Sequence, residues 1–598
     1  MKNWGFNVVV FFCFFLMSLS VEAAGALQIS YTVSFPEAQA HYADIEMDIK
    51  GLSQSKLNLH LPVWTPGSYL VREFSKNVES LSAESGGKAV ASTKTRKNVW
   101  QLNTQGLSSV KVKYRFYSFE ISVRTAFIDV THAFLATSNM FFYPEGGLNL
   151  PSTIHIKPYK NWDKVSTSLD MVGNDPFTIK APNYDILYDS PIEVGNQDVF
   201  SFKAAGVNYE VAMYGGGNYN KERLKKDMAK IIEVETAIFG ENPNKRYVFI
   251  VHNYAKGGGG LEHLSSTVLG AARDGYGKEG AYEGFLGLVA HEHFHLWNVK
   301  RLRPIALGPF DYENENYTTN LWIAEGFTAY YDNLAVRRTQ LFPIDHYLGA
   351  LAADFNTIDN TPGAKLQPLS MASFDAWIKS YRPDENTVNT SISYYNKGAV
   401  IAMLLDLEII NDTQGRQSLD DVMRYMYNEY YKNKKRGYTD AEFKQAVEKF
   451  AGKNLDEFYR KYINGVDNID YNQYLAYAGY KAVDEYAGLE GPDLGIRMIL
   501  VNGKLRISGI LRGTSAWVDG LSVNDELVSI DGVPATDPKT LMLNKRVGDK
   551  LSVVVMRDGQ MLTIPVTLLQ NKQVKYHIES LPSLTPQQEV VRKKWLKL

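Results

Sequence analysis

One short motif in this sequence has the residue types and spacing to hold a metal ion and to activate water. His291-Glu292-His293-Phe294-His295 follows an apolar stretch, 285–290, with helical character. Residues four apart share a helix face, so His291 and His295 could bind one Zn²⁺ through neutral imidazoles. Glu292 would lie beside the open coordination position and could take a proton from the attacking water. His293 is turned to the opposite face, and we expect it to be structural.

A catalytic zinc needs a third protein ligand and an open fourth position. Glu325 is the best candidate, because it is the only acidic residue in the apolar segment Leu321–Tyr331. The alternative is a buried glutamate that is merely ion-paired. The chain has a single cysteine, which excludes a thiolate-rich metal site. We therefore expect one Zn²⁺ per chain, held by nitrogen and oxygen atoms.

A glycine run precedes a second notable glutamate. Gly258, Gly259 and Gly260 lie in Gly257–His263, directly after a predicted strand that ends at Tyr254. Glycines allow a close backbone approach, as an edge strand that pairs with a peptide requires. Glu262 could then bind the free α-ammonium of a substrate. The alternative is a flexible glycine loop with an exposed glutamate.

Three kinds of segment must position these residues. Residues 24–205 alternate apolar and polar positions, as half-buried strands do, and predict an antiparallel β-sandwich-like domain. Residues 206–480 combine a short apolar strand with many helical segments, including 282–298 and 320–339, and form the expected catalytic domain. Short strands return over 485–570, and we expect the polar segment 571–598 to be a solvated terminus. The fold class is thus multidomain α+β.

The N-terminus predicts export. One positive charge, an apolar run from Val8 to Leu19 and a small-residue site at Ala23 have the order of a signal peptide over 1–23. A membrane anchor is the alternative, but the run is shorter than the ~20 residues that a span requires. The lone cysteine, Cys13, lies inside this segment. We expect a periplasmic or extracellular protein. A net charge of −2 argues against a nucleic-acid partner.

Longer stretches of the chain resemble the PDZ-bearing glycyl aminopeptidases, a branch of the gluzincin metallopeptidases with a thermolysin-like catalytic domain. The similar stretches are 64–69, 258–263, 291–304, 373–379 and 393–399. The resemblance implies that Glu325 is the third ligand and that Glu262 binds the substrate N-terminus. Tyr395, in Tyr395-Asn-Lys-Gly398, would hydrogen-bond the oxyanion. It also implies cleavage after small N-terminal residues, glycine and alanine.

Two departures from the wider gluzincin pattern are visible. Residues 303–317 read as an insertion that lengthens the spacing between His295 and Glu325. Ala329 stands where thermolysin-like enzymes carry an acidic residue that orients a ligand, so the sequence does not identify the groups that orient the zinc ligands.

The block 485–570 resembles a PDZ domain, in which Leu494, Gly495 and Ile496 would form the loop that binds a peptide carboxylate. The domain could instead only pack against the catalytic part. Three functions remain open from sequence alone. The first is an aminopeptidase acting on peptides with a free N-terminus. The second is an endopeptidase that uses the PDZ domain to recruit peptide C-termini. The third is an inactive peptide-binding scaffold.

Overall fold

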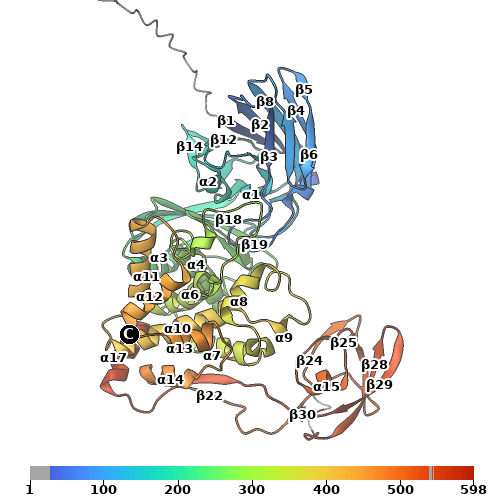
Figure 1. Cartoon of the computed structure of the whole chain (residues 1–598), viewed down its shortest axis with the longest axis vertical. Helices are drawn as coiled ribbons and strands as arrows, with labels where there is room; N and C mark the ends of the chain where they lie inside the picture. The colour runs from blue at the N-terminus through green and yellow to red at the C-terminus, as the bar shows by residue number, and fades with distance from the viewer. Residues whose placement is uncertain (1–26, 538–541, 543) are drawn as a thin grey trace, which may run out of the picture.

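The computed structural model describes residues 27–537, 542 and 544–598, so the predicted signal peptide over 1–23 lies outside the described residues. A β-rich N-terminal part lies against a helical middle part, and a small β domain is set to one side (Figure 1). This agrees with the expected multidomain α+β class. Among the described residues, no helix is both long and apolar enough to cross a bilayer.

The N-terminal domain contains three sheets with short helices between them. Its strands alternate as expected: in β2, Ala43, Ile45, Met47 and Ile49 point into the core. One sheet contains β1 (Gln28–Ser34), β2 (Tyr42–Lys50), β4 (Val78–Ser85), β5 (Lys88–Val90), β8 (Ser109–Tyr117), β12 (Ser152–Lys157), β14 (Asp170–Val172) and β15 (Asp175–Ala181). A second contains β3 (Lys56–His60), β6 (Ser92–Arg96), β7 (Val99–Asn103) and β11 (Tyr143–Pro144). The third contains β9 (Phe127–Ile128), β10 (His132–Leu135), β13 (Lys164–Thr167) and β16 (Ile192–Gly195), and the helices are α1 (Thr137–Met140) and α2 (Tyr184–Tyr188).

The sheet of the catalytic domain has five strands in the order β17-β18-β19-β21-β20. These are β17 (Asp198–Ala204), β18 (Val207–Tyr214), β19 (Arg246–Tyr254), β20 (Gly260–Glu262) and β21 (Ser266–Ala272). The expected boundary at residue 205 is therefore wrong, because β17 pairs with β18 rather than with the N-terminal sheets. The strand that carries Glu262 lies at the open edge of this sheet.

Helices build the rest of the catalytic domain. They are α3 (Lys221–Phe239), α4 (Glu279–Phe294), α5 (Leu321–Ala324), α6 (Gly326–Arg338), α7 (Ile344–Asp359), α8 (Leu369–Phe374), α9 (Thr387–Thr390), α10 (Tyr394–Asp412), α11 (Leu419–Met426), α12 (Asp440–Ala451), α13 (Asp456–Phe458) and α14 (Tyr471–Leu475). The single helix expected over 320–339 is divided at Glu325 into α5 and α6.

Two glycines set the crossing of α6 and α10. A Cβ on Gly326 would lie 2.5 Å from the Cα atom of Gly398, and a Cβ on Gly398 would lie 2.6 Å from the carbonyl oxygen of Trp322. Only glycine permits this approach. Because Gly326 follows Glu325 and Gly398 lies one turn after Tyr395, the contact brings the two functional candidates to one site.

The segment 571–598 was expected to be a solvated terminus. This expectation is wrong, because the segment is folded against the catalytic domain. β31 (Tyr576–Ser580) pairs antiparallel with β22 (Tyr480–Asp484), and α17 (Pro586–Leu596) follows. Val591, Trp595 and Leu596 of α17 are fully buried in the core of the catalytic domain. The PDZ domain is thus inserted into the catalytic domain between β22 and β31.

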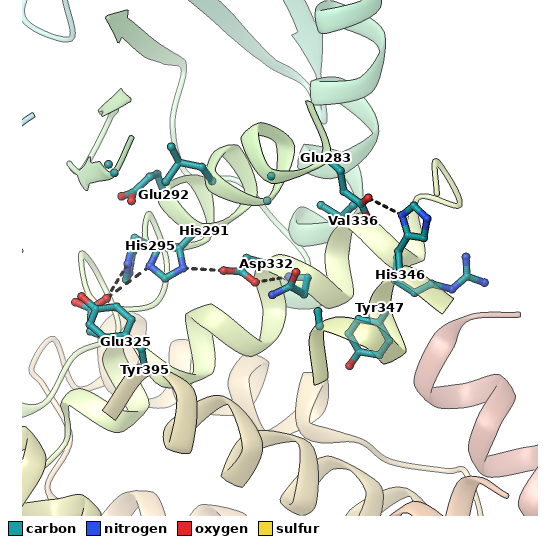
Figure 2. Close-up of a pocket in the computed structure, with 18 of the residues that line it drawn as sticks. Glu283, His291, Glu292, His295, Glu325, Asp332, Val336, His346, Tyr347 and Tyr395 are labelled. Carbon is teal, nitrogen blue, oxygen red and sulfur yellow. Dashed lines mark hydrogen bonds and ion pairs between the residues drawn. The ribbon is translucent and has the colours of Figure 1, made fainter. Parts of the chain in front are cut away.

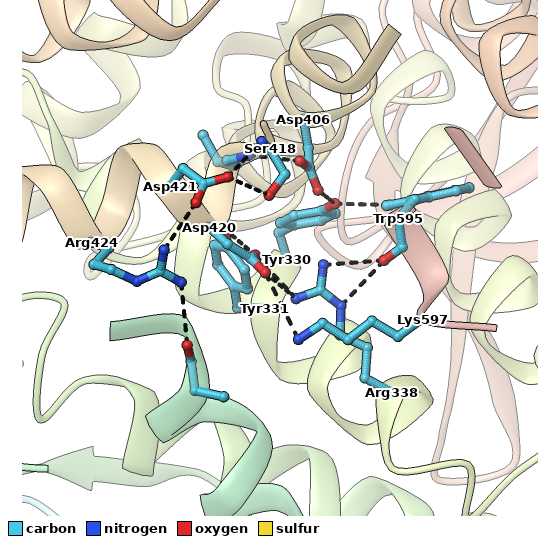
Figure 3. A network of polar contacts seen from close by, with 12 residues as sticks. Tyr330, Tyr331, Arg338, Asp406, Ser418, Asp420, Asp421, Arg424, Trp595 and Lys597 are labelled. Carbon is cyan, nitrogen blue, oxygen red and sulfur yellow. Dashed lines mark hydrogen bonds and ion pairs between the residues drawn. The ribbon is translucent and has the colours of Figure 1, made fainter. Parts of the chain in front are cut away.

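Polar contacts fix α17 as well (Figure 3). The guanidinium of Arg338 donates to the carbonyl oxygen of Trp595 at 3.1 and 3.2 Å and to both carboxylate oxygens of Asp420. The indole Nε1 of Trp595 donates to the hydroxyl of Tyr330 at 2.9 Å, and that hydroxyl donates to Asp406. The last helix therefore holds α6, which carries part of the candidate site.

The inserted domain has its own apolar core. Its elements are β23 (Pro492–Asp493), β24 (Ile496–Val501), β25 (Lys504–Ile510), α15 (Ser515–Asp519), β26 (Glu526–Ile530), β27 (Val533–Pro534), β28 (Lys550–Arg557), β29 (Gln560–Thr567) and β30 (Leu569–Gln570). It contacts the catalytic domain through Asn389, whose amide donates to the carbonyl of Ile510 and accepts from the backbone N–H of Arg512.

Candidate active site

The structure brings His291, His295 and Glu325 together. Their ligand atoms lie within 4.8 Å of one another, with the Oε2 atom of Glu325 3.3 Å from His295 Nε2 and 3.7 Å from His291 Nε2. Both histidines come from the C-terminal end of α4, and Glu325 comes from the junction of α5 and α6. Burial raises the pKa of the Glu325 carboxyl, but the two histidines outweigh it and lower the pKa to about 2. The glutamate is therefore ionised, as a metal ligand must be.

The second nitrogen of each histidine is also held, which the sequence did not reveal. Asp332 Oδ2 accepts from His291 Nδ1 at 2.9 Å (Figure 2). The carbonyl oxygen of Asn298 accepts from His295 Nδ1 at 2.8 Å. Such partners fix the tautomer and orientation of a ligating imidazole and leave Nε2 free for a metal. Asp332 lies seven residues after Glu325, two helical turns along, and not at the expected position 329.

The donor set fits a zinc ion. Two imidazoles and one carboxylate converge with oriented rings, which is the chemistry of a three-ligand catalytic zinc site. Glu292 lies next to them and is only 4% exposed. Its Oε2 atom is buried and has no hydrogen-bond partner among the described residues. A buried polar group normally has a partner, so this atom points to a group, such as a water, bound in the site.

Glu292 is also pressed against the edge strand. A Cβ on Gly260 would lie 2.2 Å from Glu292 Oε1, so only glycine fits at this position of β20. Burial raises the pKa of Glu292 to about 7, in the range that suits a general base at neutral pH.

Glu262 lies at the closed end of the same cavity, with its ligand atom within 4.8 Å of those of Glu292 and His295. Gly67, in the stretch 64–69, packs on its carboxylate: a Cβ there would lie 2.4 Å from Glu262 Oε1. Arg124 of the N-terminal domain lines this end too and donates to the carbonyl of Gly260 at 3.2 Å. The N-terminal domain thus closes the site, and sequence reasoning missed Arg124.

The glycines of the run 257–260 differ in their surroundings. A Cβ on Gly257 would lie 2.3 Å from the carbonyl oxygen of Ala271, whereas a Cβ on Gly258 would meet no atom within 4 Å. Gly259 has a positive φ of 78° and, with Gly260, lines the cavity. The insertion 303–317 supports the same region, because the carbonyl oxygen of Asp311 accepts from Trp64 Nε1 at 2.7 Å.

Of the two adjacent tyrosines, only Tyr395 lines the cavity. Tyr395 lines the cavity, and its ring lies 6.2 Å from that of His291, whereas Tyr394 is 1% exposed and does not line it. Burial raises the pKa of Tyr395 well above its usual value, so the phenol keeps its proton and can donate a hydrogen bond.

His293 points away from the metal ligands, as expected. It is fully buried, with Nδ1 2.6 Å from Glu235 Oε2 and Nε2 3.0 Å from the hydroxyl of Tyr209. Burial lowers the pKa of His293 to about 3 and raises that of Glu235, so both are neutral. The pair anchors α4 to α3 and the sheet.

A second group of possible ligands, His132, Glu193 and His252, joins the N-terminal and catalytic domains. Each carboxylate oxygen of Glu193 accepts one histidine N–H, at 2.7 Å from His132 and 2.9 Å from His252. These are ordinary hydrogen-bond lengths, and the group acts as a buried polar link.

In the PDZ domain, Leu494 is buried, Gly495 has a φ of 72° and packs on Thr514, and Ile496 begins β24. β24 lies at the edge of its sheet, where a peptide strand could add. Part of the segment 538–543 lies outside the described residues.

The chain has an α+β fold and a site in which His291, His295 and Glu325 converge. The carboxylates of Glu292 and Glu262 lie beside them. This combination defines a metallopeptidase of the gluzincin class. Comparison with protein families matches the Peptidase M61 N-terminal domain at 30–196, M61 glycyl aminopeptidase at 284–401 and a PDZ domain at 492–568. The chain belongs to the M61 glycyl aminopeptidase family and is a metallo-aminopeptidase.

Among solved structures, an aminopeptidase N family protein from Idiomarina loihiensis is 28% identical, with a TM-score of 0.89 over 95% of this chain and 100% of that one. An M1 zinc metallopeptidase from Deinococcus radiodurans, bound to a Tyr-Ser-Ala substrate, is 14% identical with a TM-score of 0.45 over 74% of this chain and 94% of that one. The latter similarity is too low to carry an inference. A search of curated proteins found no match.

Proposed function

We propose that the protein holds one Zn²⁺ with His291, His295 and Glu325 and removes the first residue from peptides with a free N-terminus. The observation that carries the proposal is the convergence of these ligand atoms beside Glu292, with Glu262 closing the cavity on one side. A bound Zn²⁺ would supply a Lewis acid for the scissile carbonyl and would lower the pKa of water.

The protein side chains would do the rest of the chemistry. Glu292 takes a proton from the attacking water and later gives it to the leaving amine, which a pKa of about 7 allows. The hydroxyl of Tyr395 donates to the oxyanion that develops on the carbonyl. Glu262 binds the α-ammonium and so restricts cleavage to the first residue. The match to the M61 glycyl aminopeptidase model supports glycine or alanine as that first residue.

Further parts of the proposal concern the remaining segments. Residues 1–23 would direct export, and the mature enzyme would act in the periplasm or the medium. The PDZ domain would add a peptide C-terminus to β24, with the loop of Leu494, Gly495 and Ile496 at its carboxylate. The domain would thereby bind peptides independently of the catalytic site.

The test measures zinc content and cleavage together. Glycyl and alanyl peptides are compared with the same peptides acetylated at the N-terminus. We expect about one zinc per chain, and cleavage of the free peptides only. Equal cleavage of both forms would favour the endopeptidase instead. A zinc-loaded enzyme that cleaves neither would favour the scaffold. Glu292→Gln should retain zinc and lose turnover.

A further inference from the structure

The cavity that contains the metal ligands continues beyond them, away from Glu262. Its volume is about 710 Å³, and it runs from Glu262 past His291 and along α4 to the start of α7. In Figure 2, Glu283, Val336, His346 and Tyr347 lie well away from the ligand cluster. This part of the cavity has no role in the chemistry described above.

One face of α4 is bare of side chains along this path. Gly280, Gly284 and Gly287 precede His291 at helical spacings of four, three and four, so all four residues share one face. A Cβ on any of the three glycines would meet no atom within 4 Å, and all three line the cavity. The glycines therefore do not serve helix packing, and the space over them is open.

Side chains from α6 and α7 form the opposite wall. Val336 comes from α6, and Phe342 and Tyr347 come from the start of α7 and the turn before it. Glu283 of α4 and His346 of α7 also line this part of the cavity and form an ion pair at 2.6 Å. We name the space between the glycine face and this wall the α4 channel.

An unsatisfied donor in the wall points to a ligand. Arg337 lines the cavity and is only 9% exposed, and its Nε atom is buried without a hydrogen-bond partner among the described residues. Among the described residues, the guanidinium makes one hydrogen bond, a long one of 3.5 Å from Nη1 to the carbonyl oxygen of Phe342. A buried guanidinium normally pairs with carboxylate or carbonyl oxygens, which a peptide supplies.

The length of the channel sets the length of its occupant. The eleven positions from His291 to Gly280 span about 16 Å at 1.5 Å per residue. An extended peptide rises by about 3.3 Å per residue, so the channel holds about five residues. Glu262 closes the other end beside the ligands, so these residues must follow the scissile bond.

We propose that the α4 channel binds the four or five residues that follow the scissile bond, and that the substrates are oligopeptides rather than dipeptides. This rests on the proposed function, because Glu262 fixes the direction of the peptide. The glycine face lets the peptide backbone lie against α4, and Arg337 pairs with a carbonyl or carboxylate oxygen of the peptide.

The experiment blocks the channel at two depths. Gly284→Leu and Gly280→Leu place a side chain in open space on an exposed helix face, where replacing glycine does not weaken a helix. Gly349→Leu is the matched control, because Gly349 is exposed on α7, has open space around it and does not line the cavity. Zinc content and circular dichroism verify that each variant is loaded and folded.

Three substrates are compared: glycyl p-nitroanilide, Gly-Ala-Ala and Gly-(Ala)₅. The wild type should show kcat/KM rising at least tenfold from the tripeptide to the hexapeptide. Gly284→Leu and Gly280→Leu block the channel about 10 and 16 Å from His291, so each should raise KM at least tenfold for the hexapeptide and leave the tripeptide unchanged, because its two residues after the scissile bond reach only about 7 Å. The anilide should change less than twofold in all variants, and Gly349→Leu should resemble the wild type.

A kcat/KM that is flat with peptide length would overturn the proposal, as would equal losses on the anilide and the hexapeptide. Failure of the proposed function looks different, since the wild type would then cleave the N-acetylated hexapeptide as well as the free one, or would cleave no substrate.

Discussion

The most quantitative prediction concerns Trp595 on the last helix. Its side chain is fully buried, and its indole N–H donates to Tyr330 at 2.9 Å. Truncating a buried tryptophan to alanine costs about 3–5 kcal/mol, to which the lost hydrogen bond contributes about 1 kcal/mol. Trp595→Ala should therefore lower the free energy of unfolding of the catalytic domain by about 4 kcal/mol.

At about 2–4 °C per kcal/mol for a large domain, this corresponds to a fall of about 8–16 °C in the unfolding midpoint. Differential scanning calorimetry of the zinc-loaded protein measures it. Trp595→Phe keeps a ring in the site and should lose only about 1–2 kcal/mol. Trp517→Ala makes the same truncation on the PDZ domain, where the indole is 43% exposed, and should change stability by less than about 0.5 kcal/mol.

The reasoning is refuted if Trp595→Ala and Trp517→Ala leave the catalytic transition at the same temperature. That result would mean that α17 detaches in solution and contributes nothing to the core.

Three further predictions concern the site. Asp332→Asn should weaken zinc binding by about 10–100-fold in a chelator competition, because the imidazole of His291 loses its anionic partner; unchanged affinity would contradict this role. Tyr395→Phe should lower kcat by about 10²–10³-fold with zinc content unchanged, and a KM effect alone would argue for a packing role. Gly260→Ala should abolish most turnover, since its Cβ would lie 2.2 Å from Glu292 Oε1. Steady-state kinetics on glycyl p-nitroanilide measures this, and an unchanged kcat would show that the site accommodates the methyl group.

The sequence identified the ligand candidates because their geometry is local. The spacing of His291 and His295 is determined within one helix turn, and an isolated glutamate in apolar surroundings marked Glu325. Asp332 was missed although its signal was available, since a residue seven after Glu325 returns to the same helix face. Arg124 carried no such signal, because it reaches the site from another domain.

Pairing between distant segments explains the other errors. The alternation in β17 predicts a strand but does not say which sheet it joins. In the C-terminal segment, Val591 and Trp595 have helical spacing among many charged residues, a pattern that fits a solvated helix as well as a buried one. Whether this helix is solvated or buried depends on the surface of α6 and α10 against which it packs, and the sequence does not show that surface.

The insertion of the PDZ domain has a consequence for synthesis. Residues 586–596 leave the ribosome after the whole PDZ domain, yet they complete the core around α6, which carries Asp332 and follows Glu325. A nascent chain that already contains every candidate catalytic residue still lacks this support. Peptidase activity should thus arise only after translation has passed the whole PDZ domain, and truncation after residue 585 should silence the enzyme while leaving its active-site sequence intact.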